Sequence, residues 1–135
     1  MIIVLLLACT ATDAPFAFSK TLGDHAVLQN PIVIWGTGAP GSEVTTVVNA
    51  SAGAAAATAP GAAAAPGTSL ETKVGADGIW RQPLGAMATG LAAYTITSTI
   101  TSRTSSGDLD ADADTDAPIV LKDVLVGVTF LCSGQ

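Results

Sequence analysis

The sequence predicts an all-β protein, an antiparallel β-sandwich of the Ig-like or jelly-roll-like kind. Its 135 residues contain several short runs rich in β-branched side chains, separated by turn-forming residues. One run alternates without a break, so Tyr94, Ile96, Ser98 and Ile100 fall on one face and threonines on the other. The alanine stretches are too short to hold a helix alone in water. Together with the small size, these features favour a single two-layer domain.

Six segments have the composition of strands. Residues 32–35 (IVIW) and 43–49 (EVTTVVN) come first and are rich in β-branched side chains. Residues 69–74 (SLETKV) and 79–84 (IWRQPL) lie on either side of Asp77-Gly78, a favoured hairpin turn. Residues 92–101 (AAYTITSTIT) carry the alternation, and residues 119–131 (IVLKDVLVGVTFL) form a long strand that leads to the end of the sequence.

The core must be built from few large side chains, because only 4% of the residues are aromatic. Burying an indole removes on the order of 200 Å² from water, at roughly 25 cal/mol per Å². Loss of either tryptophan should therefore be costly. The expected anchors of the core are Phe16, Phe18, Trp35, Trp80 and Tyr94.

Two segments interrupt the strand pattern and are predicted to be loops. Residues 50–69 form a low-complexity run of Ala, Gly and Pro, in which Pro60 and Pro66 oppose helix formation. Residues 105–117 form an acidic loop with five aspartates, and without these the net charge of −6 would become −1. A solvated acidic loop is the favoured interpretation.

Calcium binding by this acidic loop is the alternative. Its last aspartates, together with Asp123, follow the spacing of EF-hand ligands. Ala117 stands where the sharp turn needs glycine, and Pro118 with the strand after it leaves no exiting helix. No metal site and no cofactor are therefore predicted. The aspartates concerned are Asp112, Asp114 and Asp116.

The amino-terminal residues 1–14 are predicted to be a signal peptide, so the protein should be secreted, lysosomal or otherwise extracytoplasmic. The apolar run at residues 2–8 is too short to span a bilayer, and no membrane span is expected. Removal of the signal would take Cys9 and leave Cys132 without a partner, so no disulfide is implied. An acidic chain without a basic patch is an unlikely partner for nucleic acid.

The carboxyl-terminal tail runs from an apolar strand into a small-residue turn, Ser133-Gly134-Gln135. From pattern alone this is an ordinary buried strand ended by a turn. However, LKDVLVGVTFLCSGQ resembles the segment VLVGDVWLCSGQ of the sialate O-acetylesterase family, which continues Ser-Asn-Met. The nucleophile of that family is the serine after the Gln. By this resemblance the three turn residues lie beside a catalytic site, and the chain contains no catalytic residue.

Earlier blocks resemble the same family in order and spacing. GDHAVLQ at residues 23–29 resembles a D-H-M-V-L-Q turn, and VIWG at residues 33–36 a V-x-W-G strand. Phe16-Ala17-Phe18, PGSEVT at residues 40–45 and DGIW at residues 77–80 add weaker matches. The chain departs from the family at Val128, Thr129 and Phe130, where an acidic residue, Val and Trp are usual, and at Ala26, where Met is usual.

The resemblance implies that residues 15–118 form the sandwich and that residues 119–135 are a strand entering a missing α/β hydrolase domain. The parent protein would hydrolyse O-acetyl esters of sialic acids, or of other acetylated glycans, through an activated serine. The His and Asp of that site lie downstream in the family, so a triad of His25 with Ser133 is rejected. The 135-residue chain alone is predicted to be inactive.

The alternative function is a non-catalytic secreted binding or adhesion module for carbohydrate. Two exposed aromatic side chains at sugar-stacking distance would favour this alternative. Burial of both Trp35 and Trp80 would weaken it.

Overall fold

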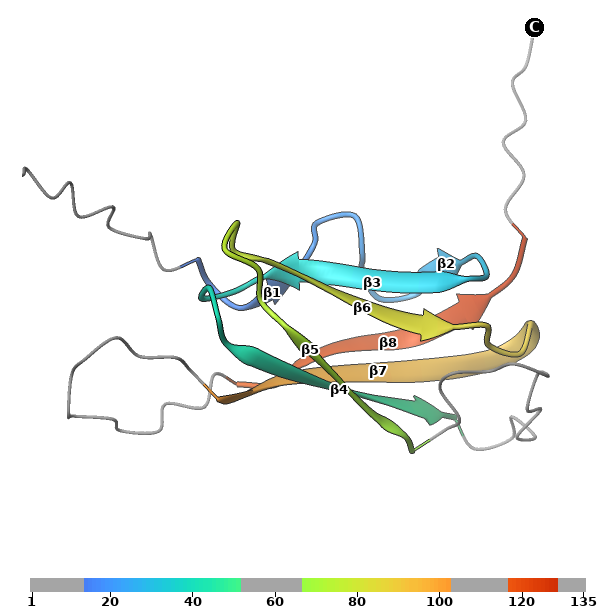
Figure 1. The fold of residues 1–135 in the computed structure, drawn as a ribbon. Coiled ribbons are helices and arrows are strands. Elements are labelled where there is room, and N and C mark those ends of the chain that lie inside the picture. The colour runs from blue at the N-terminus through green and yellow to red at the C-terminus, as the bar shows by residue number, and fades with distance from the viewer. Residues whose placement is uncertain (1–13, 52–66, 103–116, 129–135) are drawn as a thin grey trace, which may run out of the picture.

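The described part of the protein forms eight strands in two sheets that pack face to face (Figure 1). The structure, a computed structural model, describes residues 14–51, 67–102 and 117–128. All the regular structure within these three ranges is β, which confirms the predicted all-β class and the two-layer arrangement.

The smaller sheet has three antiparallel strands in the order β1-β3-β6. They are β1 (Ala17–Phe18), β3 (Ile32–Thr37) and β6 (Ile79–Gly85). The larger sheet has five strands in the order β2-β8-β7-β4-β5. They are β2 (Val27–Leu28), β8 (Ile119–Val126), β7 (Gly90–Ser102), β4 (Glu43–Ala50) and β5 (Ser69–Lys73). Strand β2 runs parallel to β8, so the sandwich is not antiparallel throughout.

Two expectations about connectivity are wrong. The sequence predicts that the sandwich is residues 15–118 and that residues 119–135 are a strand leading into a missing catalytic domain. Residues 119–126 instead form β8, which pairs with both β2 and β7 inside the larger sheet. Asp77-Gly78 does form a tight turn, in which Asp77 Oδ1 accepts a hydrogen bond from the Ile79 amide at 3.1 Å. However, this turn carries the chain from β5 in one sheet to β6 in the other, so it does not close a hairpin.

The core lies between the sheets and follows the two-residue period of the strands. On β7, Tyr94, Ile96, Ser98 and Ile100 are buried, as the alternation predicted. Inside this layer the hydroxyls of Thr46 and Ser98 form a buried hydrogen bond of 2.8 Å, which satisfies both polar groups. The apolar members of the core are Ile32, Ile34, Val44, Val48, Val74, Trp80, Leu84, Met87, Tyr94, Ile96, Ile100, Leu121, Val124 and Val126.

Trp80 is fully buried, as predicted, and its Nε1 donates a 3.1 Å hydrogen bond to the carbonyl oxygen of Thr37. Phe16 and Phe18 are half-buried, and their ring centroids lie 5.9 and 5.6 Å from that of Trp80. The expectation that Trp35 anchors the core is wrong. Ile34 and Gly36 point inward on β3, so the residue between them must face outward.

Four segments with predictions lie outside the described residues. Residues 1–13 hold nearly all of the predicted signal peptide, and residues 52–66 hold most of the low-complexity loop. Residues 103–116 include the aspartates of the acidic loop, and residues 129–135 include Cys132 and the turn Ser133-Gly134-Gln135.

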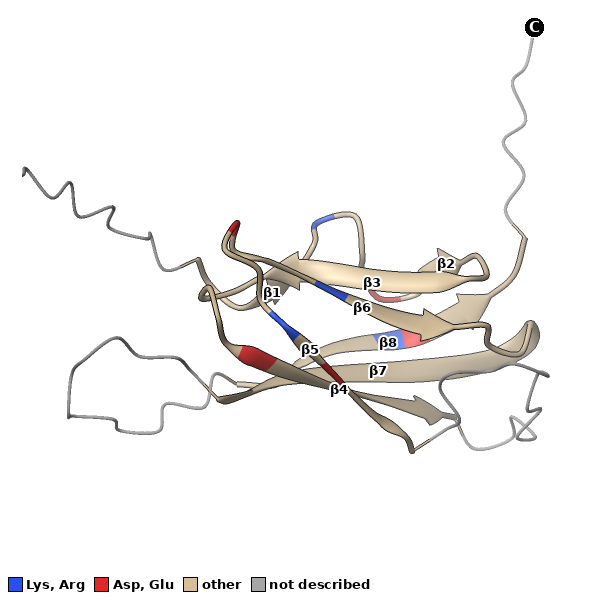
Figure 2. Ribbon diagram, viewed as in Figure 1, with Lys and Arg blue, Asp and Glu red and all other residues tan. Residues whose placement is uncertain are grey.

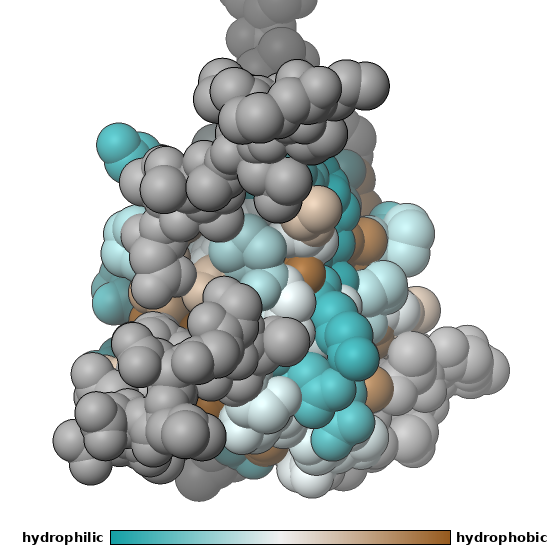
Figure 3. Space-filling view, turned by 60° about the vertical axis from the view of Figure 1, so that its left-hand side comes forward, coloured by the Kyte–Doolittle hydropathy of each residue, from teal (hydrophilic) through white to brown (hydrophobic). Residues whose placement is uncertain are grey.

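The face of the molecule drawn in Figure 3 is mixed in hydropathy. Figure 3 shows brown apolar residues in small separate areas among pale and teal hydrophilic ones. Within residues 14–51, 67–102 and 117–128, no helix has the length and apolar character needed to cross a membrane.

Candidate functional site

Two places on the sandwich bear on function: the junction of β2 with β8, and a pocket beside Trp35. The first lies just before the predicted catalytic turn. The second lies on the smaller sheet and was not predicted from the sequence.

The junction of β2 with β8 joins residues that are almost a hundred positions apart in the sequence. Asp24 Oδ1 accepts a 2.8 Å hydrogen bond from the Lys122 amide, and the His25 amide donates to the Lys122 carbonyl at 2.9 Å. These bonds bring the GDHAVLQ block against the LKDVLVG block.

Two further backbone bonds extend the junction along β8. The amide of Leu125 donates to the carbonyl of Ala26 at 2.9 Å, and the amide of Gly127 donates to that of Leu28 at 3.0 Å. These bonds continue the parallel pairing of β2 with β8. The last described residues of the chain are therefore held in place by the GDHAVLQ block.

The turn and the strand both use unusual backbone conformations where they meet. His25 has φ of 63° and Asp123 has φ of 54°, in the left-handed region that non-glycine residues seldom adopt. At Asp123, strand β8 contains an extra residue relative to β7, which is a β-bulge. His25 Nδ1 and Asp123 Oδ2 lie 3.6 Å apart, and both side chains are exposed.

This pair of side chains gives no support to catalysis or to calcium binding. The described residues contain no group of three His, Cys, Asp or Glu side chains that could hold a metal ion. The three aspartates expected to accompany Asp123 around calcium, and the Ser133 weighed as a partner of His25, lie outside the described residues. We therefore interpret His25 and Asp123 as part of the junction.

Asp24 should contribute to stability through its bond to β8. We expect Asp24→Ala to lower the free energy of unfolding by about 1 kcal/mol, because the Lys122 amide loses its acceptor. Hydrogen exchange at that amide should become faster. Asp24→Asn is the matched control, since it keeps a side-chain oxygen in the same place. Unchanged exchange at Lys122 in Asp24→Ala would show that this bond does not hold the junction together.

The pocket beside Trp35 has a volume of about 500 Å³ and lies where β1, β3 and the start of β6 meet. Trp35 is 38% exposed. The Ser19 amide donates to the Trp35 carbonyl at 2.9 Å, and the Leu22 amide closes a turn onto the Ser19 carbonyl at 2.8 Å. This turn places Lys20 next to Trp35. The pocket is lined by Pro15, Ala17, Phe18, Ser19, Lys20, Trp35, Gly36, Thr37 and Ile79.

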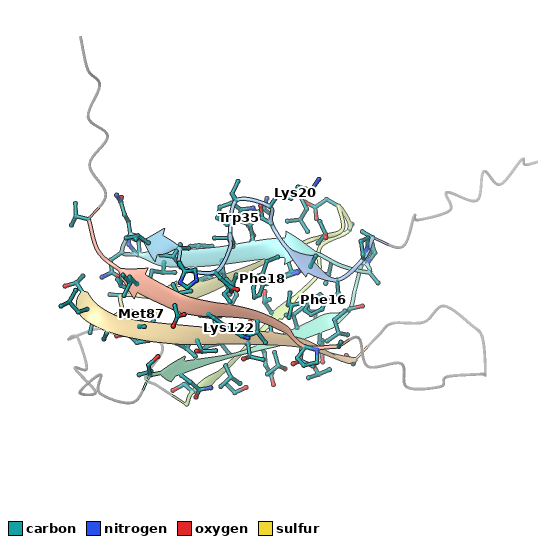
Figure 4. The ribbon with its side chains drawn as sticks, turned by 180° about the vertical axis from the view of Figure 1, so that it is seen from behind. Phe16, Phe18, Lys20, Trp35, Met87 and Lys122 are labelled. Atoms are coloured by element: carbon teal, nitrogen blue, oxygen red, sulfur yellow. The ribbon has the colours of Figure 1, made fainter. Side chains whose placement is uncertain are left out.

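Figure 4 shows Trp35 and Lys20 on the outer side of the smaller sheet, whereas Phe16 and Phe18 point between the sheets. One tryptophan is thus exposed and the other buried. The carbohydrate-binding alternative would be favoured by two exposed aromatic side chains, but Phe18, the aromatic neighbour of Trp35 in the pocket, is half-buried. It would be weakened by burial of both tryptophans, but only Trp80 is buried. The sequence did contain a signal for this site, since strict alternation along IVIWGT places Trp35 opposite in direction to the two isoleucines.

Comparison with known proteins adds no relative to this picture. No protein-family model matches the chain, and no curated protein matches it.

Proposed function

We propose that the chain is the amino-terminal sandwich domain of a sialate O-acetylesterase-like carbohydrate esterase. One observation carries the proposal. The two sequence blocks with the most specific likeness to that family, GDHAVLQ and the run that ends in LCSGQ, meet at the junction of β2 with β8. Two sequence blocks that contact each other in the fold are expected to occur in the same family. Here the GDHAVLQ block holds β8 in position, and β8 leads in the sequence to the proposed catalytic turn.

In this proposal the sandwich positions the catalytic site and does not itself catalyse. The Ig-like or jelly-roll-like sandwich is followed by an α/β hydrolase domain, which supplies the nucleophilic serine after Gln135 and the downstream His and Asp. The His deprotonates the Ser, the acidic group orients the His, and an oxyanion hole holds the tetrahedral intermediate. The turn Ser133-Gly134-Gln135 contributes at most backbone groups to that site.

The substrate of the parent protein would be an O-acetylated sialic acid or another acetylated glycan. The location of the protein is proposed from the signal peptide predicted at residues 1–14. The proposed location is therefore extracytoplasmic.

The first test of the proposal is to read the coding sequence past the codon for Gln135. We expect Ser-Asn-Met to follow, with an Asp and a His further downstream. A stop codon, or an unrelated continuation, would overturn the assignment to an esterase.

The second test is enzymatic. The 135-residue chain should hydrolyse an activated acetyl ester no faster than a denatured-protein blank, because it lacks the nucleophile and its base. A longer protein that includes the predicted serine should hydrolyse the ester, and replacing that serine by Ala should abolish the activity. Hydrolysis by the 135-residue chain itself would contradict the proposal that catalysis belongs to the downstream domain.

A further inference from the structure

The outer face of the smaller sheet carries an exposed indole between two cations. The register of β3 with β6 places three residue pairs on this face: Val33 opposite Pro83, Trp35 opposite Arg81, and Thr37 opposite Ile79. Arg81 therefore flanks Trp35 on one side, with Cβ atoms about 5 Å apart, as is usual for cross-strand neighbours. On the other side, the turn after β1 brings Lys20 into the pocket with Trp35.

The charge of this face is opposite to that of the whole chain. Lys20 and Arg81 are two of only five Lys and Arg residues in a protein of net charge −6. Figure 2 shows blue segments on β6 and on the turn that follows β1. Neither of the two cations forms an ion pair with any residue in the described ranges. Asp24 and Asp77, in the turns before β2 and β6, both accept hydrogen bonds from backbone amides.

Trp35 also keeps its polar atom free among the described residues. The indole Nε1 of Trp80 is bonded to a backbone carbonyl, but that of Trp35 has no such partner within residues 14–51, 67–102 and 117–128. Ser19 and Thr37 add hydroxyl groups to the same pocket. The pocket therefore combines a flat apolar surface, a free N–H donor, hydroxyls and the Lys20 cation. Arg81 lies outside the pocket lining, beside Trp35 on β6.

We propose that this pocket binds a pyranose sugar that carries a carboxylate. The apolar face of the sugar ring would stack on the Trp35 indole, and the hydroxyls would bond to the polar groups at the rim. Lys20, which lines the pocket, would pair with the carboxylate, and Arg81, on the β6 side of Trp35, would add positive charge nearby. The pocket volume of about 500 Å³ lies within the range of small-molecule sites.

An aromatic side chain between two cations also resembles a platform for single-stranded nucleic acid. Nucleic acid is disfavoured here because a polyanion would be repelled by a chain of net charge −6. A single carboxylate on a sugar avoids most of that repulsion. This inference does not rest on the proposed esterase function, since the pocket lies on the smaller sheet and the junction of β2 with β8 on the larger one.

The test is a titration of the 135-residue chain followed by tryptophan fluorescence. The probes are sialyllactose and a glucuronic acid disaccharide, with lactose as the neutral sugar and a single-stranded oligonucleotide as the polyanion. The chain has only two tryptophans, and Trp80 is fully buried, so quenching by acrylamide reports mainly on Trp35. The acidic sugars should protect Trp35 from the quencher at concentrations where lactose does not.

Variants then assign the site. Trp35→Ala should weaken binding of the acidic sugars, measured by calorimetry, by about tenfold or more. Lys20→Gln and Arg81→Gln should weaken the acidic sugars but leave lactose unchanged. Lys73→Gln is the matched cation control, because Lys73 lies on the larger sheet and pairs with Glu43 at 3.3 Å. Emission from buried Trp80 verifies that Trp35→Ala remains folded.

Three results would overturn the inference. The first is equal affinity for acidic and neutral sugars, or no binding of either. The second is unchanged affinity in folded Trp35→Ala. The third is tighter binding of the oligonucleotide than of the acidic sugars, which would identify a polyanion surface. Tighter binding of sialyllactose or of the glucuronic acid disaccharide would support the inference and identify which acidic sugar the pocket prefers.

Discussion

Trp80→Ala should be among the most damaging single substitutions in this protein, with an expected loss of about 3–5 kcal/mol in the free energy of unfolding. The side chain is fully buried, contacts the rings of Phe16 and Phe18, and donates a hydrogen bond to Thr37. Truncation removes all of these contacts and leaves a cavity. Since a small domain has only about 5–15 kcal/mol of stability in total, much of the protein should unfold.

The measurement is urea denaturation followed by far-ultraviolet circular dichroism. Trp35→Ala is the matched control, because it removes the same side chain from the outer face and should cost less than about 1 kcal/mol. Trp80→Phe should lie between the two, since it keeps a ring but loses the bond to Thr37. Equal losses for Trp80→Ala and Trp35→Ala would contradict the inside-outside arrangement of β3 and β6.

Gly36→Ala is expected to cost about 3 kcal/mol, near the top of the range for overpacked cores. A Cβ at this position would overlap the carbonyl oxygen of Ala17 and would lie 2.8 Å from a ring atom of Trp80. Neither neighbour yields easily, because one is strand backbone and the other is a fully buried ring. We expect β1 to separate from β3, with a corresponding loss of stability.

Denaturation gives the magnitude, and hydrogen exchange at the Ser19 amide reports the separation, because that amide bonds to Trp35 beside Gly36. Gly23→Ala is the matched control. A Cβ on Gly23 meets nothing within 4 Å, so its stability should hardly change. Normal stability of Gly36→Ala would show that β1 is not packed closely against β3.

Much of the fold was predictable from the sequence because period-two patterns report directly on burial. The alternation on β7 correctly identified its inner face. The prediction for Trp35 is wrong because its position on β3, not its size, decides which way it faces. Ile34 and Gly36 occupy the inner face of β3, so Trp35 lies on the outer face.

The pairing of strands was less predictable because it depends on contacts between distant segments. Nothing local distinguishes a strand that ends a sandwich from one that begins another domain, so the sequence alone does not predict that β8 pairs with β7. The turn at Asp77-Gly78 has the chemistry of a hairpin, yet its two strands diverge into different sheets. The Trp35 pocket was missed for the same reason, since the turn that carries Lys20 meets β3 only in the folded chain.

The position of β8 determines when this domain can fold during synthesis. Strand β8 lies between β2 and β7, so both remain without this neighbour until residues 119–126 have left the ribosome. The bond from Asp24 to Lys122 spans 98 positions, and such non-local contacts slow folding. A nascent chain that stops short of β8 would leave β2 unpaired and expose the edge of β7, and open edges are sites of aggregation. Strand β8 therefore completes a sheet in which one edge strand, β2, is made about ninety residues earlier.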